Sequence, residues 1–211
     1  MRKWYPWLVV AAAFAFSAAV FNRLPDQVPT HWNAHGEVNG MSSRAFAAWL
    51  VPGILAIMAL VLPFLPTIDP RRANFEKFQG SYDLVVNTVI TMVALLHVAM
   101  LGSALGWPIA MARLTPLMMG AVFLLLGNVL PRARPNWWFG IRTPWTLSND
   151  RVWERTHRVG GYFFAGAGVL LMLAALLPPA MALPVIVVVA VTAGVVPLVY
   201  SYVAWRQETR Q

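Results

Sequence analysis

The chain has 211 residues, contains no cysteine and carries charge on only 11% of its residues. Without cysteine it can form no disulfide, no iron–sulfur cluster, no thiol nucleophile and no cysteine-ligated zinc site. A soluble globular protein has about a quarter of its residues charged, so this chain lacks the polar side chains that a water-facing surface needs. The composition therefore excludes a soluble cytosolic monomer.

The short motifs of soluble enzymes are also missing. The sequence contains no GxGxxG, no phosphate-binding loop, no GxSxG and no HExxH. Its eight acidic residues, none of them inside a long apolar run, leave few candidates for catalysis by paired carboxylates. We therefore expect a protein that is not an enzyme, with no catalytic residue and no cofactor.

Long apolar runs are what the sequence has instead, since 59% of its residues are hydrophobic. A bilayer-spanning helix needs roughly 17–25 such residues. The first run, behind Arg2 and Lys3, also fits a secretory signal peptide, but we expect it to be a retained span because the chain starts at Met1. We predict an all-α integral membrane protein with six transmembrane helices, at residues 4–21, 46–65, 84–105, 114–130, 160–177 and 183–204.

The positive charge is concentrated in alternate loops. The formal net charge is +8, and thirteen of the sixteen basic side chains fall in the two termini and in the second and fourth loops. Basic loops stay on the cytoplasmic side of the membrane, so we predict that both termini are cytoplasmic. We therefore interpret the positive charge as a topology signal of a protein in the bacterial cytoplasmic (inner) membrane, whose partner is the lipid bilayer. The charge gives no support for direct binding of nucleic acid.

Two loops are too long to be mere connections, and long loops often carry function. They suggest three regions in the chain. Residues 1–66 form a two-span unit with a structured extracellular loop at 22–45, residues 67–113 hold the third span, and residues 114–211 hold spans four to six with a cytoplasmic loop at 131–159. In the last loop, the spacing of apolar and charged residues predicts an amphipathic helix from about Asn149.

The outer loop is rich in proline and glycine, which favours short strands or compact irregular structure. His31, His35 and Glu37 are candidate ligands for a divalent metal, because imidazole and carboxylate groups suit such ions. The alternatives are an interfacial loop with Trp32 among the lipid headgroups, or a sensor of external acid. We include Asn33 with these residues as a candidate for ligand binding.

The inner loop places Arg142 among aromatic side chains and between a glycine and a proline. Its six arginines could simply hold anionic headgroups, or they could form a docking surface for a cytosolic partner or an anionic ligand. The fixed geometry expected around Arg142 favours the second role. The candidate binding residues are Asn128, Asn136, Trp137, Arg142, Thr143, Trp145, Trp153, Thr156, His157 and Arg158.

Both loops carry recognisable motifs. The inner loop reads Gly-Asn-x-Leu-Pro, Gly-Ile-Arg-Thr-Pro-Trp-Thr-Leu-Ser and Val-Trp-x-x-Thr-His-Arg, and it resembles the SdpI family of bacterial immunity proteins. The outer loop reads Leu-Pro-x-x-Val-Pro-x-His-Trp-Asn and resembles the membrane domain of unknown function often found upstream in that family. The resemblance implies a polytopic protein that protects against a secreted toxic peptide and that signals by holding a transcriptional repressor at the membrane. His35 departs from the family pattern.

Polar residues inside spans are functional candidates by default. Asn87 and His97 in the third span could serve transport together with Asn128, or they could only link helices. A stripe of small residues at Gly161, Ala165 and Gly168 allows close helix approach within one bundle or in a homodimer. Our leading hypothesis is immunity with signalling; a small transporter or channel is the alternative, and a membrane metalloenzyme that uses the outer-loop histidines is a third.

Overall fold

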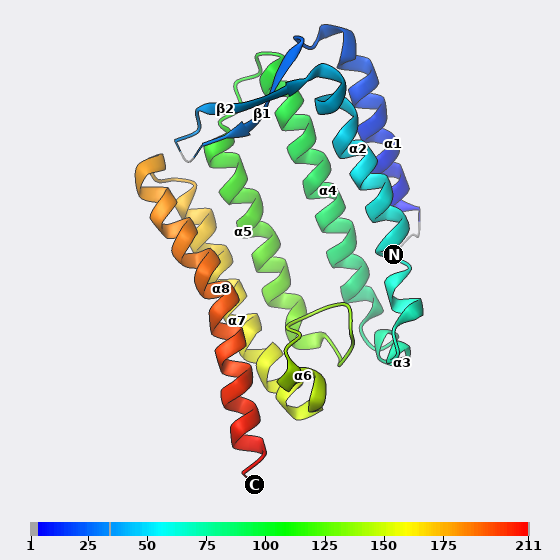
Figure 1. Ribbon diagram of the computed structural model, residues 1–211, viewed down its shortest axis with the longest axis vertical. Coiled ribbons are helices and arrows are strands. Elements are labelled where there is room, and N and C mark those ends of the chain that lie inside the picture. Colours follow the sequence, from blue (N-terminus) through cyan, green and yellow to red (C-terminus); the bar gives the residue numbers. More distant parts are fainter. Residues whose placement is uncertain (1–3, 34, 211) are drawn as a thin grey trace.

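The computed structural model describes residues 4–33 and 35–210 and is mostly helical (Figure 1). Two short helices, α3 (Arg72–Phe75) and α6 (Pro144–Ser148), accompany the six long ones. All six long helices have the length and hydropathy to cross a bilayer, so the predicted six-span membrane protein is confirmed. They are α1 (Tyr5–Val20), α2 (Arg44–Val61), α4 (Gln79–Ala104), α5 (Met111–Val129), α7 (Asp150–Ala174) and α8 (Pro179–Glu208).

Helix α7 differs from the sequence prediction in one respect. The amphipathic helix expected in the inner loop and the fifth span form one continuous helix from Asp150, so the irregular loop ends at residue 149 and not at 159. The Asn149 side chain begins this helix by accepting hydrogen bonds from the backbone N–H groups of Arg151 and Val152, at 2.9 and 3.1 Å. A single rod therefore runs from the polar loop into the membrane.

The outer loop forms an antiparallel hairpin of two strands, β1 (Gln27–Trp32) and β2 (Val38–Ser43). Short strands were one of the two structures that its turn-forming residues favoured. Val28 is fully buried and packs with Leu24, Ala48 and Leu101 over the ends of α1, α2 and α4. The hairpin lies at one end of the molecule, and α3, α6 and the end of α8 lie at the other (Figure 1).

The long helices pack as two groups. Helices α1, α2 and α4 share a core around Leu55, Tyr82 and Ile90, whereas α5 packs along α7 and α7 along α8. Glycine permits the close contact of α5 with α7, since a Cβ at Gly127 would lie 2.5 Å from the backbone nitrogen of Ala165. The small-residue stripe of the fifth span thus serves packing within this bundle, and the two groups meet where α4 contacts α5.

Candidate functional site

Asn136 organises the inner loop from within. Its side chain is fully buried; Nδ2 donates to the carbonyl oxygens of Arg134 and Phe139, at 2.8 and 2.9 Å. Its Oδ1 accepts from the backbone N–H groups of Trp138 and Phe139, at 2.9 and 2.7 Å. An amide offers two donors and one carbonyl oxygen, and the loop uses all of them. Asn136 therefore holds the backbone and has no group left for a ligand.

His157 fastens the same loop to α7. Its buried ring stacks on Trp153, with 4.0 Å between the ring centroids. Nε2 accepts from the backbone N–H of Ile141 at 2.9 Å, and Nδ1 donates to the Trp153 carbonyl oxygen at 2.9 Å. Both ring nitrogens are thus used. Gly140 fits beside them because it has no Cβ: at its φ of 113° a Cβ would lie 2.3 Å from Nε2.

Thr143 and Thr146 begin α6 and connect it to α8. They form a reciprocal capping box, in which the Thr146 hydroxyl receives the Thr143 N–H at 2.9 Å and the Thr143 hydroxyl receives the Thr146 N–H at 3.2 Å. The Thr143 hydroxyl also donates to the buried Ser201 hydroxyl of α8 at 3.0 Å. Thr143, which the sequence places among the binding candidates, is therefore a buried link between two elements.

The remaining buried candidates face the protein interior as well. The Trp153 indole donates to the Ala133 carbonyl oxygen at 2.9 Å. Thr156 is fully buried, and within the described residues its hydroxyl has no hydrogen-bond partner. Trp145 is half-buried against Tyr202, with 5.1 Å between their ring centroids.

Four of these candidates reach the surface of the loop and helices. Arg142 is exposed, and its guanidinium donates to the Trp137 carbonyl oxygen at 2.7 Å. The Trp137 ring beside it is 49% exposed. Arg158 and Asn128 are exposed on α7 and α5. Of the ten inner-loop candidates, Arg142 and Trp137 are therefore the pair that a partner can reach together.

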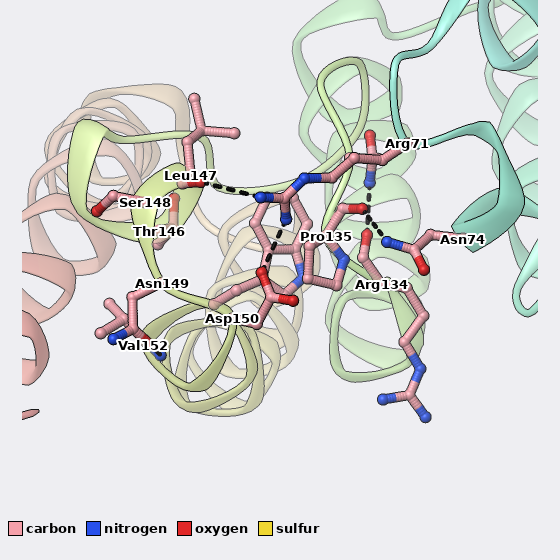
Figure 2. Close-up of polar contacts among 12 residues, drawn as sticks. Arg71, Asn74, Arg134, Pro135, Thr146, Leu147, Ser148, Asn149, Asp150 and Val152 are labelled. Carbon is pink, nitrogen blue, oxygen red and sulfur yellow. Dashed lines mark hydrogen bonds and ion pairs between the residues drawn. The ribbon is translucent and has the colours of Figure 1, made fainter.

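Three residues between α2 and α4 grip the inner loop from the other helix group; we name Asp69, Arg71 and Asn74 the clamp. The buried Asp69 carboxylate accepts from the backbone N–H of Trp137 at 2.8 Å. Arg71 pairs with Asp150 at 2.8 Å, and Asn74 donates to the Pro135 carbonyl oxygen at 2.7 Å (Figure 2). The clamp was not predicted from the sequence; its one signal was Asp69, one of only eight acidic residues in the chain.

The inner arginines divide into paired and unpaired ones. Arg151 and Arg155 of α7 both reach Glu208 of α8, at 3.0 and 3.6 Å, and Arg134 pairs with Glu154 at 3.1 Å. Within the described residues, the exposed arginines of the loop and of α7 that make no such ion pair are Arg132, Arg142 and Arg158. Anchoring to lipid is thus not needed to explain the paired arginines, which hold protein elements together.

At the hairpin end, Asn33 shapes the turn between the strands. Its Oδ1 accepts from the backbone N–H groups of His35 and Glu37, and its Nδ2 donates to the Glu37 carboxylate at 2.8 Å. The His31 Nδ1 donates to the Asn39 side chain at 2.5 Å. Across residues 4–33 and 35–210, no three His, Asp or Glu side chains gather as a group that could hold a metal ion. The predicted metal site stays a hypothesis without such a cluster.

A crevice of about 340 Å³ lies between the hairpin and α5. One wall is β1 with the residue that follows it, from Thr30 to Asn33, so His31, Trp32 and Asn33 come together there as candidates. The facing wall is largely apolar and is formed by Met111, Ala112, Thr115, Pro116 and Met119 of α5 with Ile186 of α8. A second, wholly apolar cleft of about 170 Å³ lies between α4 and α5.

The polar candidates inside the membrane lie outside both of these cavities. His97 is buried in α4 and shares a hydrogen bond of 2.7 Å with the Ser17 hydroxyl of α1. Asn87 is also buried in α4. Neither the crevice nor the apolar cleft is lined by His97, Asn87 or Asn128. The contacts of His97 are those of a link between helices, and the transporter hypothesis receives no support from them.

Comparison with known proteins gives a consistent assignment. Residues 132–201 match the model of the SdpI/YfhL protein family, and residues 8–56 match that of a domain of unknown function, DUF1648. The chain is 22% identical to the immunity protein SdpI of Bacillus subtilis (strain 168) over 195 residues, which cover 92% of this chain and 91% of the relative. No solved structure matches it significantly. The predicted resemblance is thus confirmed: this multi-pass inner-membrane protein matches the SdpI/YfhL family over one region and DUF1648 over a region that precedes it.

Proposed function

We propose that this protein is a membrane immunity protein that binds a secreted toxic peptide in the crevice between β1 and α5. Similarity over almost the whole chain to a relative named an immunity protein supports the class of function. The crevice carries the rest of the proposal, because it joins polar groups of the hairpin to apolar side chains of α5 in one concave surface. Such mixed lining is typical of ligand sites.

The test is protection of a sensitive bacterial strain. Cells that express the chain should survive higher concentrations of at least one peptide in a panel of secreted toxic peptides. Thr115→Trp fills the crevice and should abolish this protection, whereas Leu117→Trp, on the exposed face of the same helix, should keep it. Unchanged killing by every peptide, with the protein present in the membrane at normal level, would overturn the proposal.

The opposite end suits a cytosolic partner, and we extend the proposal to recruitment of a transcriptional repressor there. The exposed Arg132, Arg142 and Arg158 are the observation that supports this extension, because a positive surface attracts an acidic partner. Candidate repressors encoded next to the gene should bind the membrane protein when toxic peptide is present. Arg142→Glu should abolish that binding and Arg23→Glu, at the hairpin end, should not; equal binding by both variants would contradict the extension.

A further inference from the structure

The crevice follows the edge of strand β1. Side chains along a strand point alternately to opposite faces, so a cavity against one face would touch every second residue. This crevice touches Thr30, His31, Trp32 and Asn33 in succession. The register with β2 is irregular between Pro29 and His31 and between His31 and Trp32, but one extra residue in a strand does not place four successive side chains on one face. It therefore runs alongside the backbone, where a strand presents its N–H and C=O groups.

That edge of β1 has no neighbouring strand within the described residues. The sheet there contains two strands, and β1 pairs with β2 on one side only. In an antiparallel pair, every second residue of an edge strand turns its N–H and C=O away from its partner. Pro29, which has no N–H to donate, lies just before the stretch that meets the crevice. Thr30, His31 and Trp32 each have an N–H group, whereas the N–H of Asn33 already donates to the Glu37 carbonyl oxygen at 2.9 Å.

The facing wall adds an acceptor and a flexible apolar surface. Pro116 of α5 has no N–H, so the Ala112 carbonyl one turn earlier receives no ordinary helical hydrogen bond, and both residues line the crevice. Met111 and Met119 on the same wall can adapt to side chains of different shape. Among the residues that the structure describes, no Asp, Glu, Lys or Arg lines the crevice. Its occupant is therefore uncharged along the stretch that it inserts.

The geometry points to β-strand addition as the way in which the crevice takes its ligand. An extended, uncharged segment of the toxic peptide pairs its backbone with the free edge of β1 and places alternate apolar side chains against α5. This inference rests on the proposed function and specifies the class of ligand. A second copy of the chain does not fit, because the protein's own α5 and Ile186 close the far side of the crevice.

A short synthetic peptide tests the pairing directly. The probe is the fluorescently labelled, terminally blocked hexapeptide Val-Thr-Val-Thr-Val-Thr, and its matched control carries N-methyl groups on alternate residues, which remove the donors of one edge. The full-length protein in lipid nanodiscs should bind the probe at least about tenfold more tightly than the control, because two or three backbone hydrogen bonds are at stake. Thr115→Trp should weaken probe binding by a similar factor, and Leu117→Trp should leave it unchanged.

Equal binding of the probe and its N-methylated control, including no binding of either, overturns strand addition. Equal binding of the probe by wild-type protein and Thr115→Trp overturns its location in the crevice. Neither result bears on immunity itself, which the survival assay measures. If the wild-type chain protects cells while the probe experiment fails, the proposed function stands and strand addition falls; if the wild-type chain never protects cells, the proposed function falls instead.

Discussion

The two ends of this molecule differ in the room that they leave for a ligand. At the end with α6, the amide of Asn136, the ring nitrogens of His157 and the hydroxyl of Thr143 are all bonded to the protein's own backbone or side chains. At the hairpin end, the side chains of Asn33 and His31 are also bonded within the hairpin, but a crevice lies between the strand β1 and α5. The motif that is easiest to recognise is therefore mainly a scaffold, and the less specific outer loop has the room for a ligand.

The largest effect that would test this scaffold is expected at Gly140. Gly140→Ala places a Cβ against the His157 ring. It also forces an alanine to take the φ of 113° that Gly140 has, which alanine disfavours. Such strain and overlap typically cost about 3 kcal/mol or more, so most of the protein should fail to fold. Gly166→Ala on α7, where a Cβ would meet open space, is the matched control. Size-exclusion profiles in detergent compare the two, and equal yields would show that the loop is not the rigid structure described.

The next effect is expected at Asn136. Asn136→Ala leaves two backbone N–H groups and two carbonyl groups of a packed loop without their partners. The loss should lower the free energy of unfolding by about 2–4 kcal/mol. Asn128→Ala removes an exposed amide of the same kind and should leave the melting temperature unchanged. A melting curve that does not distinguish the two variants would mean that Asn136 is free to serve a ligand.

A smaller effect is expected at the clamp. Arg71→Ala removes a partly exposed ion pair with Asp150, and such pairs contribute about 1 kcal/mol or less. The variant should melt slightly earlier than wild type and should keep full immunity, because the crevice is at the other end. Arg72→Ala, exposed and adjacent, is the control. Loss of immunity in Arg71→Ala alone would contradict this prediction and would show that the crevice depends on the clamp.

The smallest effect on stability is expected at Arg142, which is exposed and makes one hydrogen bond, to the Trp137 carbonyl oxygen. Arg142→Ala should insert and melt as wild type does, and yet bind a repressor less well. Thermal melting and a repressor pull-down on the same preparation separate these properties. A clear drop in melting temperature would mean that Arg142, like Asn136, holds the loop together. The distinction between buried structural residues and exposed binding residues of the inner loop would then fail.

Hydropathy was enough to predict the six spans, because the apolar side chains of each run are by themselves sufficient to favour a helix in the lipid bilayer. The strands of the hairpin were expected only as one of two structures, since proline and glycine favour turns without fixing the pairing. The clamp was not predicted, because Asn74 and Pro135 lie 61 positions apart and only the folded chain brings them together. For the same reason the sequence indicated that Asn136 and His157 matter but not that their polar groups are bonded internally.

The glycine contact between α5 and α7 has a mechanical consequence. Backbone meets backbone where Gly127 faces Ala165 and where Gly168 faces Gly120, so these two helices behave as one rigid body. At the hairpin end, α5 of this pair forms a wall of the crevice. At the opposite end, His157 of α7 holds the inner loop through the backbone N–H of Ile141. A peptide that wedged β1 away from α5 would therefore tilt the whole pair, and the tilt would displace the loop that carries Arg142 on the far side of the membrane.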